Sequence, residues 1–112
     1  MEPYTNAKDT VLLFLHAINK EDFEEVKHFT AEDLFFNGVM GQRYGADAYI
    51  NDMKKMLFKY DIQKVFVDAN DVCVLYNIDM NGKKIFTVGI YHVEESRIKT
   101  IQVVFDPRPL LS

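Results

Sequence analysis

The hydrophobic and polar pattern is clearest over residues 72–93, where two apolar runs flank Asn81-Gly82. Asn-Gly is a strong signal for a two-residue type I′ turn, because both central residues of that turn need positive φ. The pattern therefore predicts a β-hairpin in which Tyr76 lies opposite Thr87. Side chains alternate along each arm, so one face is predicted to carry Val72, Val74, Tyr76, Ile78, Ile85, Thr87, Gly89, Tyr91 and Val93. The other face is nearly as apolar and is predicted to carry Cys73, Leu75, Asn77, Phe86, Val88, Ile90 and His92.

Three segments with helical spacing of apolar residues precede the hairpin. The first helix is expected to begin after an N-cap at Asn6 and to run to about Asn19, and Asp22 can cap a short second helix. A third helix is expected from Ala46 to about Phe58. The inward faces of these helices are predicted to carry Val11, Phe14, Leu15 and Ile18, then Phe23, Val26 and Phe29, and finally Ala46, Ile50, Met53 and Leu57.

Strand-like runs complete the pattern. A short strand is predicted at Leu34–Asn37, and the three glycines within residues 38–45 are expected to bracket a mobile loop. Further strands are predicted at Tyr60–Val67, in the two arms of the hairpin, and at Ile98–Phe105. The order α-α-β-α-β-β-β-β predicts a single α+β domain over residues 1–112. Its helices would pack on one face of a curved, mainly antiparallel sheet.

The register of the last predicted strand is open between two turns. A two-residue turn at Glu95-Ser96 would send Ile101, Val103 and Phe105 to the sheet face that points away from the helices. A three-residue turn would send the same side chains to the helix side, because a shift of one residue exchanges the two faces of a strand.

Three short helices can cover only one face of such a sheet. The other face would expose a contiguous apolar patch, which monomeric proteins rarely tolerate. We therefore expect a homodimer that packs sheet to sheet. Its contact face is predicted to consist of Cys73, Leu75, Phe86, Val88, Ile90 and His92.

Composition narrows the classes of partner. The 112 residues carry a net charge of −4 with scattered basic residues, so we expect no nucleic-acid partner. No apolar run is long enough to cross a bilayer, and Met1–Asn6 lacks the basic and apolar regions of a secretory signal. The lone Cys73 excludes an intramolecular disulfide and fits a reducing cytoplasm.

Three stretches carry a resemblance to a known family. They are the end of the first helix at Ala17–Phe23, the segment Phe29–Asp33, and Gly45–Ala48 at the start of the third helix. Together with the final four strands, they make the chain similar to the nuclear transport factor 2-like superfamily, specifically its SnoaL-like and ketosteroid-isomerase-like members. The resemblance implies a cystatin-like cone, in which a bent sheet wraps a long helix and leaves a pocket between them. It also implies that dimers are common.

Ketosteroid isomerases supply a template for the chemistry that the resemblance would imply. The position of their oxyanion-donating phenol holds Phe14, the end of the short strand that carries their base holds Asn37 and Gly38, and the position of their buried acid holds Tyr91. Proton abstraction next to a carbonyl needs a base within about 3 Å of the proton. Asn37 cannot serve as that base, so we do not expect ketosteroid isomerase activity.

The predicted pocket is mostly apolar and contains two phenols. Buried phenol hydroxyls need partners, because an unpaired one costs roughly 1–3 kcal/mol. Tyr76 and Tyr91 could pair with each other, with Asn37, with water or with a ligand. These three residues are also the only candidates for a catalytic role. The pocket lining is predicted to be Phe14, Phe36, Met53, Val74, Tyr76, Ile78, Thr87 and Tyr91, with Asn37 near the mouth.

Three functions remain open at this point. The first is a protein that binds a small apolar ligand without catalysing a reaction. The second is a SnoaL-like isomerase, cyclase or dehydratase that uses Tyr91 with Asn37 or Tyr76 as polarising donors. The third is an interaction module that binds another protein through the outer sheet face. We expect no cofactor and no metal, since Asp79 and His92 lie on distant rungs of the hairpin.

Overall fold

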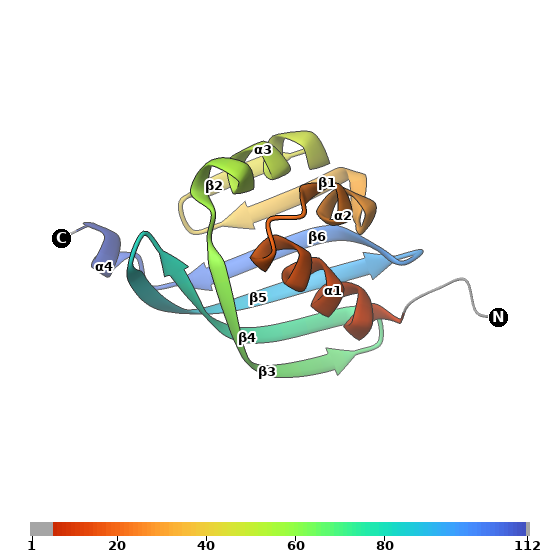
Figure 1. The fold of residues 1–112 in the computed structure, drawn as a ribbon. Helices are drawn as coiled ribbons and strands as arrows, with labels where there is room; N and C mark the ends of the chain where they lie inside the picture. Colours follow the sequence, from red (N-terminus) through yellow and green to blue (C-terminus); the bar gives the residue numbers. More distant parts are fainter. Residues whose placement is uncertain (1–5, 112) are drawn as a thin grey trace.

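The computed structural model describes residues 6–111 and confirms the α+β class (Figure 1). Residues 1–5, where the sequence predicts no secretory signal, lie outside the described part. The helices are α1 (Ala7–Asn19), α2 (Phe23–His28), α3 (Ala46–Met56) and α4 (Arg108–Leu111). The strands are β1 (Thr30–Gly38), β2 (Gly41–Tyr44), β3 (Lys59–Asp68), β4 (Asp71–Met80), β5 (Lys83–Glu94) and β6 (Arg97–Phe105).

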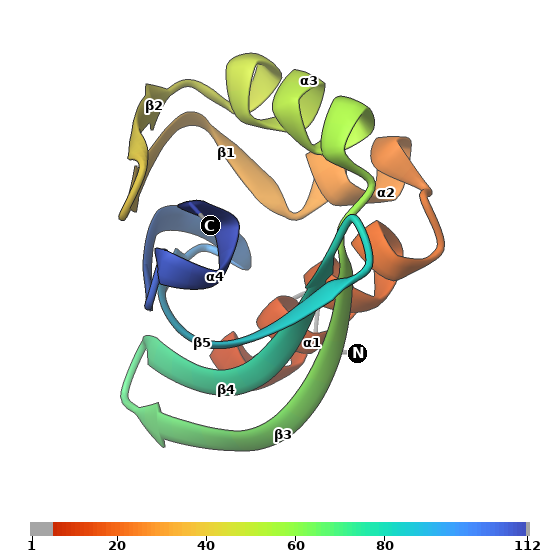
Figure 2. The ribbon, with the colours of Figure 1, turned by 90° about the vertical axis from the view of Figure 1, so that its left-hand side faces the viewer.

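All six strands form one sheet in the order β2-β1-β6-β5-β4-β3. Only β1 and β6 run parallel, and every other neighbouring pair is antiparallel. Helix α1 packs against the concave face of the four strands β3–β6 (Figure 1). Figure 2 shows how strongly the sheet bends, with α3 along one side and α4 lying inside the bend. No helix within residues 6–111 is long and apolar enough to cross a membrane.

The central hairpin has the register that the sequence predicts. Tyr76 pairs with Thr87 and Val72 pairs with Tyr91 across β4 and β5. At the turn, Asn81 has φ 55° and Gly82 has φ 90°, as a type I′ turn requires. The short turn therefore determines which side chains of both strands face the helices.

Helix α1 supplies the largest part of the core beneath the sheet. Its N-cap is Asn6, whose side chain accepts a hydrogen bond of 2.8 Å from the backbone N–H of Asp9. Val11, Phe14 and Leu15 are fully buried against the sheet. The predicted apolar stripe of this helix is thus the face that packs against β3–β6.

Two local predictions are wrong. The expected mobile loop is instead the hairpin of β1 and β2, in which Phe36 pairs with Arg43. Every side chain of β2 is exposed, so this edge strand has no apolar alternation that could reveal it. Helix α3 ends at Met56 rather than at Phe58, because Leu57 takes the left-handed conformation (φ 51°) of a C-cap and is exposed.

The last strand combines features of both predicted registers. The turn at Glu95-Ser96 has two residues, since Glu94 pairs with Arg97. A bulge then shifts the register, so that Ile101 lies opposite Tyr91 and is buried. The extra residue returns β6 to the helix side, where Val103 and Phe105 pack against the core.

Candidate functional site

Four tyrosines from four elements meet at one cavity. Tyr49 comes from α3, Tyr60 from β3, Tyr76 from β4 and Tyr91 from β5. All four line a cavity of about 470 Å³. We call them the phenol cluster. Their convergence places hydroxyl groups within a wall that is otherwise mostly apolar.

The phenol cluster contains a short hydrogen bond between oxygens and a weak bond to sulfur, and the hydroxyls of Tyr49 and Tyr60 also hydrogen-bond to each other. The hydroxyls of Tyr76 and Tyr91 lie 2.6 Å apart. The hydroxyl of Tyr60 donates to the thioether sulfur of Met53 at 3.8 Å. Thioether sulfur is a weak acceptor, so these two contacts differ greatly in strength.

The meeting of Tyr76 and Tyr91 depends on Gly89. Tyr76 and Tyr91 lie on the same sheet face, and the pair Val74–Gly89 lies between them along the hairpin. A Cβ atom at position 89 would overlap the Tyr76 hydroxyl and lie 2.8 Å from Tyr91 Cε1. Because glycine lacks this atom, both rings can lean over β5 until their hydroxyls touch.

Burial keeps the four phenols in their protonated form. It raises the pKa of Tyr76 and Tyr60, and it raises the pKa of Tyr49 and Tyr91 well above the ordinary value. The neighbouring phenols raise the pKa of Tyr49 and Tyr91 further. The four phenols are therefore neutral hydrogen-bonding groups at physiological pH.

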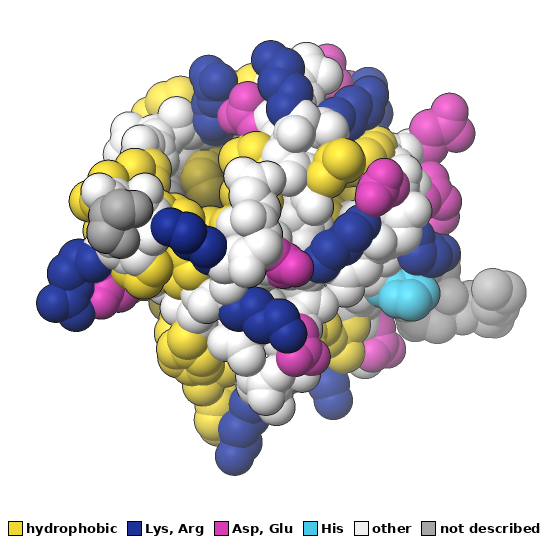
Figure 3. All heavy atoms as spheres, turned by 60° about the vertical axis from the view of Figure 1, so that its left-hand side comes forward, with side chains coloured by type: hydrophobic (Ala, Val, Ile, Leu, Met, Phe, Trp, Pro, Cys, Tyr) yellow, Lys and Arg dark blue, Asp and Glu magenta, His cyan; other side chains and the backbone are white. Residues whose placement is uncertain are grey.

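The rest of the cavity wall is mainly apolar. It is formed by the β1–β2 hairpin, α3, the inner faces of β3–β6, and α4, with side chains that include Phe36, Met56, Phe58, Ile78, Phe105 and Leu110. Figure 3 shows a recess in the molecular surface with hydrophobic side chains at its bottom. Such a hollow suits the body of a small apolar molecule.

One ion pair also lines the cavity. Arg43 on β2 contacts Asp52 on α3, with 2.7 Å between Nε and Oδ2 and 3.2 Å between Nη2 and Oδ1. Its hydrogen bonds to Asp52 raise the pKa of the Arg43 guanidinium. The pair joins the edge strand to the helix, and each charge neutralises the other beside the cavity.

The structure brings together five of the predicted pocket residues, while three others lie in the core and do not line the cavity. Those three are Phe14, Val74 and Thr87, all fully buried. The five that line it are Phe36, Met53, Tyr76, Ile78 and Tyr91.

Asn37 requires a correction. It does not line the cavity, and it is only partly buried, where its side chain accepts a hydrogen bond of 3.4 Å from Gln42. Phe36 faces the cavity, and alternation along β1 turns the next side chain to the opposite face. Asn37 therefore cannot pair with the phenols or polarise a molecule in the cavity.

Sequence reasoning missed much of the cavity wall, and four of the missed residues shape the site most directly. Tyr49 could have been found, because it flanks the apolar stripe of the third helix, and Tyr60 because it starts a strand and shares a face with Ile62. Gly89 could also have been found, because a glycine inside a strand often marks a close approach, whereas Asp52 gave no such signal. Their roles depend on contacts between elements that are distant in sequence or between neighbouring strands.

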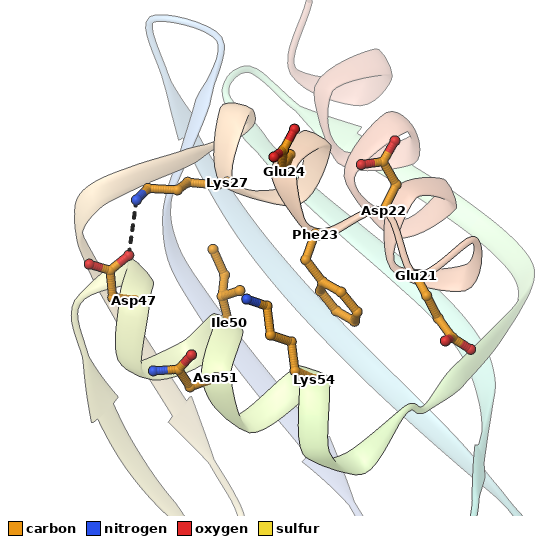
Figure 4. A pocket seen from close by; sticks show the side chains of 9 residues that line it. All are labelled: Glu21, Asp22, Phe23, Glu24, Lys27, Asp47, Ile50, Asn51 and Lys54. Carbon is orange, nitrogen blue, oxygen red and sulfur yellow. Dashed lines mark ion pairs between the residues drawn. The ribbon is translucent and has the colours of Figure 1, made fainter.

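A second hollow lies between α2 and α3 (Figure 4). It has a volume of about 580 Å³, and Phe23 and Ile50 contribute its apolar side chains. The ion pair of Lys27 and Asp47 spans it at 3.2 Å, with both side chains mostly exposed. Solvated charges surround this hollow, so it suits an apolar molecule less well than the cavity lined by the phenol cluster does. Within residues 6–111, no group of three or more His, Cys, Asp or Glu side chains is placed to hold a metal ion.

The outer sheet face carries the residues predicted for a dimer contact. Cys73 pairs with Ile90 and Leu75 pairs with Val88, so these four share one face. Four large hydrophobic side chains on this face are exposed, namely Phe66, Phe86, Ile90 and Val104. The sequence analysis selected Phe86 and Ile90 but not Phe66 and Val104. His92 lies at its margin between Asp71 (2.7 Å) and Glu94 (3.0 Å). These contacts raise the pKa of His92.

Together, the bent sheet, the helices on its concave face and the cavity lined by the phenol cluster define a small cone-shaped α+β domain. The family model for the SnoaL-like domain matches residues 11–101. The chain therefore belongs to the SnoaL-like family of the nuclear transport factor 2-like superfamily. No curated protein matches the sequence.

Solved structures support the same assignment. An NTF2-like protein of unknown function from Cytophaga hutchinsonii is 47% identical, with a TM-score of 0.96 and full coverage of both chains. An LEH-like epoxide hydrolase from M. tuberculosis is 21% identical, with a TM-score of 0.83 and coverage of 98% of this chain and 90% of that one. An NTF2-like protein of unknown function from Burkholderia pseudomallei is 18% identical, with a TM-score of 0.82 and coverage of 96% and 95%. The last two likenesses concern the fold alone.

Proposed function

We propose that this chain binds a small, largely apolar molecule in the cavity of the cone. The observation that carries the proposal is the 470 Å³ hollow lined mainly by aromatic and aliphatic side chains, with the phenol cluster in its wall. Its size lies within the range typical of ligand pockets. Apolar walls favour transfer of an apolar body from water, and a few hydroxyls give it an orientation.

Binding without the isomerase reaction is supported by the residues at the positions where ketosteroid isomerases carry their base and buried acid. Asn37 turns away from the cavity, and Gly38 lines it without a side chain. The buried-acid position holds the phenol of Tyr91, which is already bonded to Tyr76. None of these three groups can remove a proton from carbon at neutral pH.

A second candidate is an enzyme of the SnoaL-like kind that acts on a small hydrophobic substrate. One observation favours it, namely that Asp52 brings a carboxylate to the cavity wall. If an activity is found, Asp52→Asn should abolish it with binding retained, because the amide keeps the shape but cannot accept a proton. Equal turnover by this variant would exclude Asp52 as a base and leave the binding proposal.

Two adjacent valines provide a test of the binding proposal. Val103 lines the cavity, whereas Val104 is exposed on the other side of β6. Binding of the fluorescent probe N-phenyl-1-naphthylamine should weaken by at least about tenfold in Val103→Phe, since the larger ring fills the hollow. Val104→Phe is the matched control and should bind as the wild type does.

The same proposal predicts a bound molecule in protein purified under mild conditions. Native mass spectrometry should show a mass above that of the chain, which disappears on denaturation. The proposal is refuted if the wild type does not take up the probe, or if both phenylalanine variants bind it with unchanged affinity.

A further inference from the structure

Methionine is concentrated in the cavity wall. Every methionine within residues 6–111 lines the cavity, and these residues are Met40, Met53, Met56 and Met80. Met40 lies in the turn between β1 and β2, Met53 and Met56 lie on α3, and Met80 is the last residue of β4. We call the four side chains the methionine wall. They reach the cavity from three separate parts of the fold.

The close-packed core is built from other aliphatic side chains. Its largest fully buried aliphatic residues are leucine, isoleucine and valine, as at Leu15, Leu34 and Ile98. Among the leucines of the described chain, Leu110 alone lines the cavity. Leucine and methionine have similar volumes and usually replace each other at small cost. Size therefore does not explain why methionine gathers at the cavity and leucine in the core.

Stiffness distinguishes the two side chains. Methionine is unbranched, with three rotatable bonds and a polarisable thioether, so it adapts to gaps of irregular shape. Fixing it in one conformation also loses more side-chain entropy than fixing leucine does. The hydrogen bond from the Tyr60 hydroxyl holds the Met53 sulfur only weakly, at 3.8 Å. Methionine thus suits a wall that changes its shape better than a wall that keeps one.

Other parts of the site are held in one arrangement. The N–H of Tyr60 donates to Asn19 Oδ1 at 2.7 Å, and its carbonyl oxygen accepts from Asn19 Nδ2 at 2.8 Å, so the end of α1 fixes the start of β3. The hydroxyls of Tyr76 and Tyr91 hold each other at 2.6 Å. The cavity combines this fixed frame with thioether side chains that can rotate.

We infer that the methionine wall makes the cavity adjustable, so that it accepts apolar molecules of similar size and different shape rather than one molecule of fixed outline. The inference rests on the proposed function, since it names the selectivity of the same cavity. Rotation about the side-chain bonds moves the thioether groups of Met53 and Met80, which are buried, while α3 and β4 stay in place. Met40 and Met56 are exposed and adjust the wall nearer to solvent.

Two isomeric fluorescent probes test this adjustment. N-phenyl-1-naphthylamine and N-phenyl-2-naphthylamine contain the same atoms, but the first is compact and the second is elongated. In fluorescence titrations, the wild type should bind both with dissociation constants that agree within about fivefold. With all four methionines replaced by leucine, the ratio of the two constants should change by at least about tenfold, because the stiffer wall fits one outline better.

Two further variants assign the effect to the methionine wall. Met53→Leu combined with Met56→Leu changes α3 alone and should move the ratio in the same direction, which provides the test if the fourfold variant does not fold. The described chain has no methionine away from the cavity, so the matched control reverses the exchange in the core. Leu15→Met introduces methionine at a fully buried position outside the cavity wall and should keep the wild-type ratio.

NMR of methionine labelled with ¹³C in its methyl group measures the adjustment in the wild type itself. The carbon shift of this methyl group depends on the last torsion angle of the side chain. Met53 or Met80 should adopt a different torsion angle in the two complexes. The single variants Met53→Leu and Met80→Leu assign the two resonances, since each removes one of them.

The outcomes separate the inference from the proposed function. A wild type that prefers one isomer by more than about fivefold refutes the inference and leaves the binding function intact. The inference also fails if the leucine substitutions leave the ratio unchanged, if Leu15→Met changes it as they do, or if the methyl shifts are identical in both complexes. If neither isomer binds the wild type, both the inference and the proposed function fail.

Discussion

Replacing Gly89 with alanine tests the structural basis of the phenol cluster. The backbone of Gly89 lies outside the left-handed region, so alanine introduces no backbone strain there. At an unstrained position, Gly→Ala stabilises a protein by about 0.4–1 kcal/mol through the unfolded state. The structure predicts the opposite sign, because the new Cβ would overlap the Tyr76 hydroxyl and approach Tyr91 Cε1 to 2.8 Å.

The magnitude follows from two contributions. Overpacking of a close-packed core costs about 1–3 kcal/mol. Separating Tyr76 from Tyr91 also loses one buried hydrogen bond, worth about 1 kcal/mol. We therefore expect Gly89→Ala to lower the free energy of unfolding by about 2–4 kcal/mol, a large share of the 5–15 kcal/mol typical of a domain.

Urea denaturation followed by circular dichroism measures this loss, and the double variant with Tyr76→Phe identifies its cause. Removing the hydroxyl removes the overlapping atom, so alanine at position 89 should cost at least about 1 kcal/mol less in that background. The account is refuted if Gly89→Ala is as stable as the wild type or more stable. It is also refuted if the alanine costs the same in both backgrounds.

Three further outcomes are expected. Leu75→Asp or Val88→Asp should convert the predicted dimer to monomers, since each would bury an unpaired carboxylate in the contact face. Light scattering measures the change, and a dimer that survives both substitutions would mean that this face is assigned wrongly. The free energy of unfolding should fall as the pH rises above about 10. The unfolded chain then releases its phenol protons, whereas the buried tyrosines of the folded chain keep theirs because their pKa values are raised. Urea titrations at pH 8 and pH 11 that gave equal stability would contradict this. Asn19→Ala should destabilise the protein by about 1–3 kcal/mol and speed hydrogen exchange at the Tyr60 amide, and unchanged exchange there would show that Asn19 does not hold β3.

The fold was predictable wherever a local signal determines geometry. Asn81-Gly82 set the register of β4 and β5, and alternation then gave the faces of both strands correctly. The same reasoning left β6 open, because a bulge exchanges the faces of a strand without any distinctive residue type. Strand β2 was missed since its exposed polar side chains show no pattern.

The candidate site was less predictable, because it is assembled from distant parts of the chain. Tyr76 and Tyr91 were selected from their shared face, whereas the contribution of Tyr60 depends on how Asn19 fixes β3 against α1. Asn37 was placed near the mouth by analogy with a family template. Alternation from Phe36 in the actual β1 turns it to the other face.

The parallel pairing of β1 with β6 sets the time at which the cavity can exist. Phe35 pairs with Thr100 across some sixty residues of intervening chain, so this contact must form late compared with the local hairpins. During synthesis, β1 has no neighbour on this side until β6 has left the ribosome. The wall of the cavity runs in sequence from Phe36 to Leu110, so the cavity cannot be complete until residue 110 has been synthesised and folded against the rest.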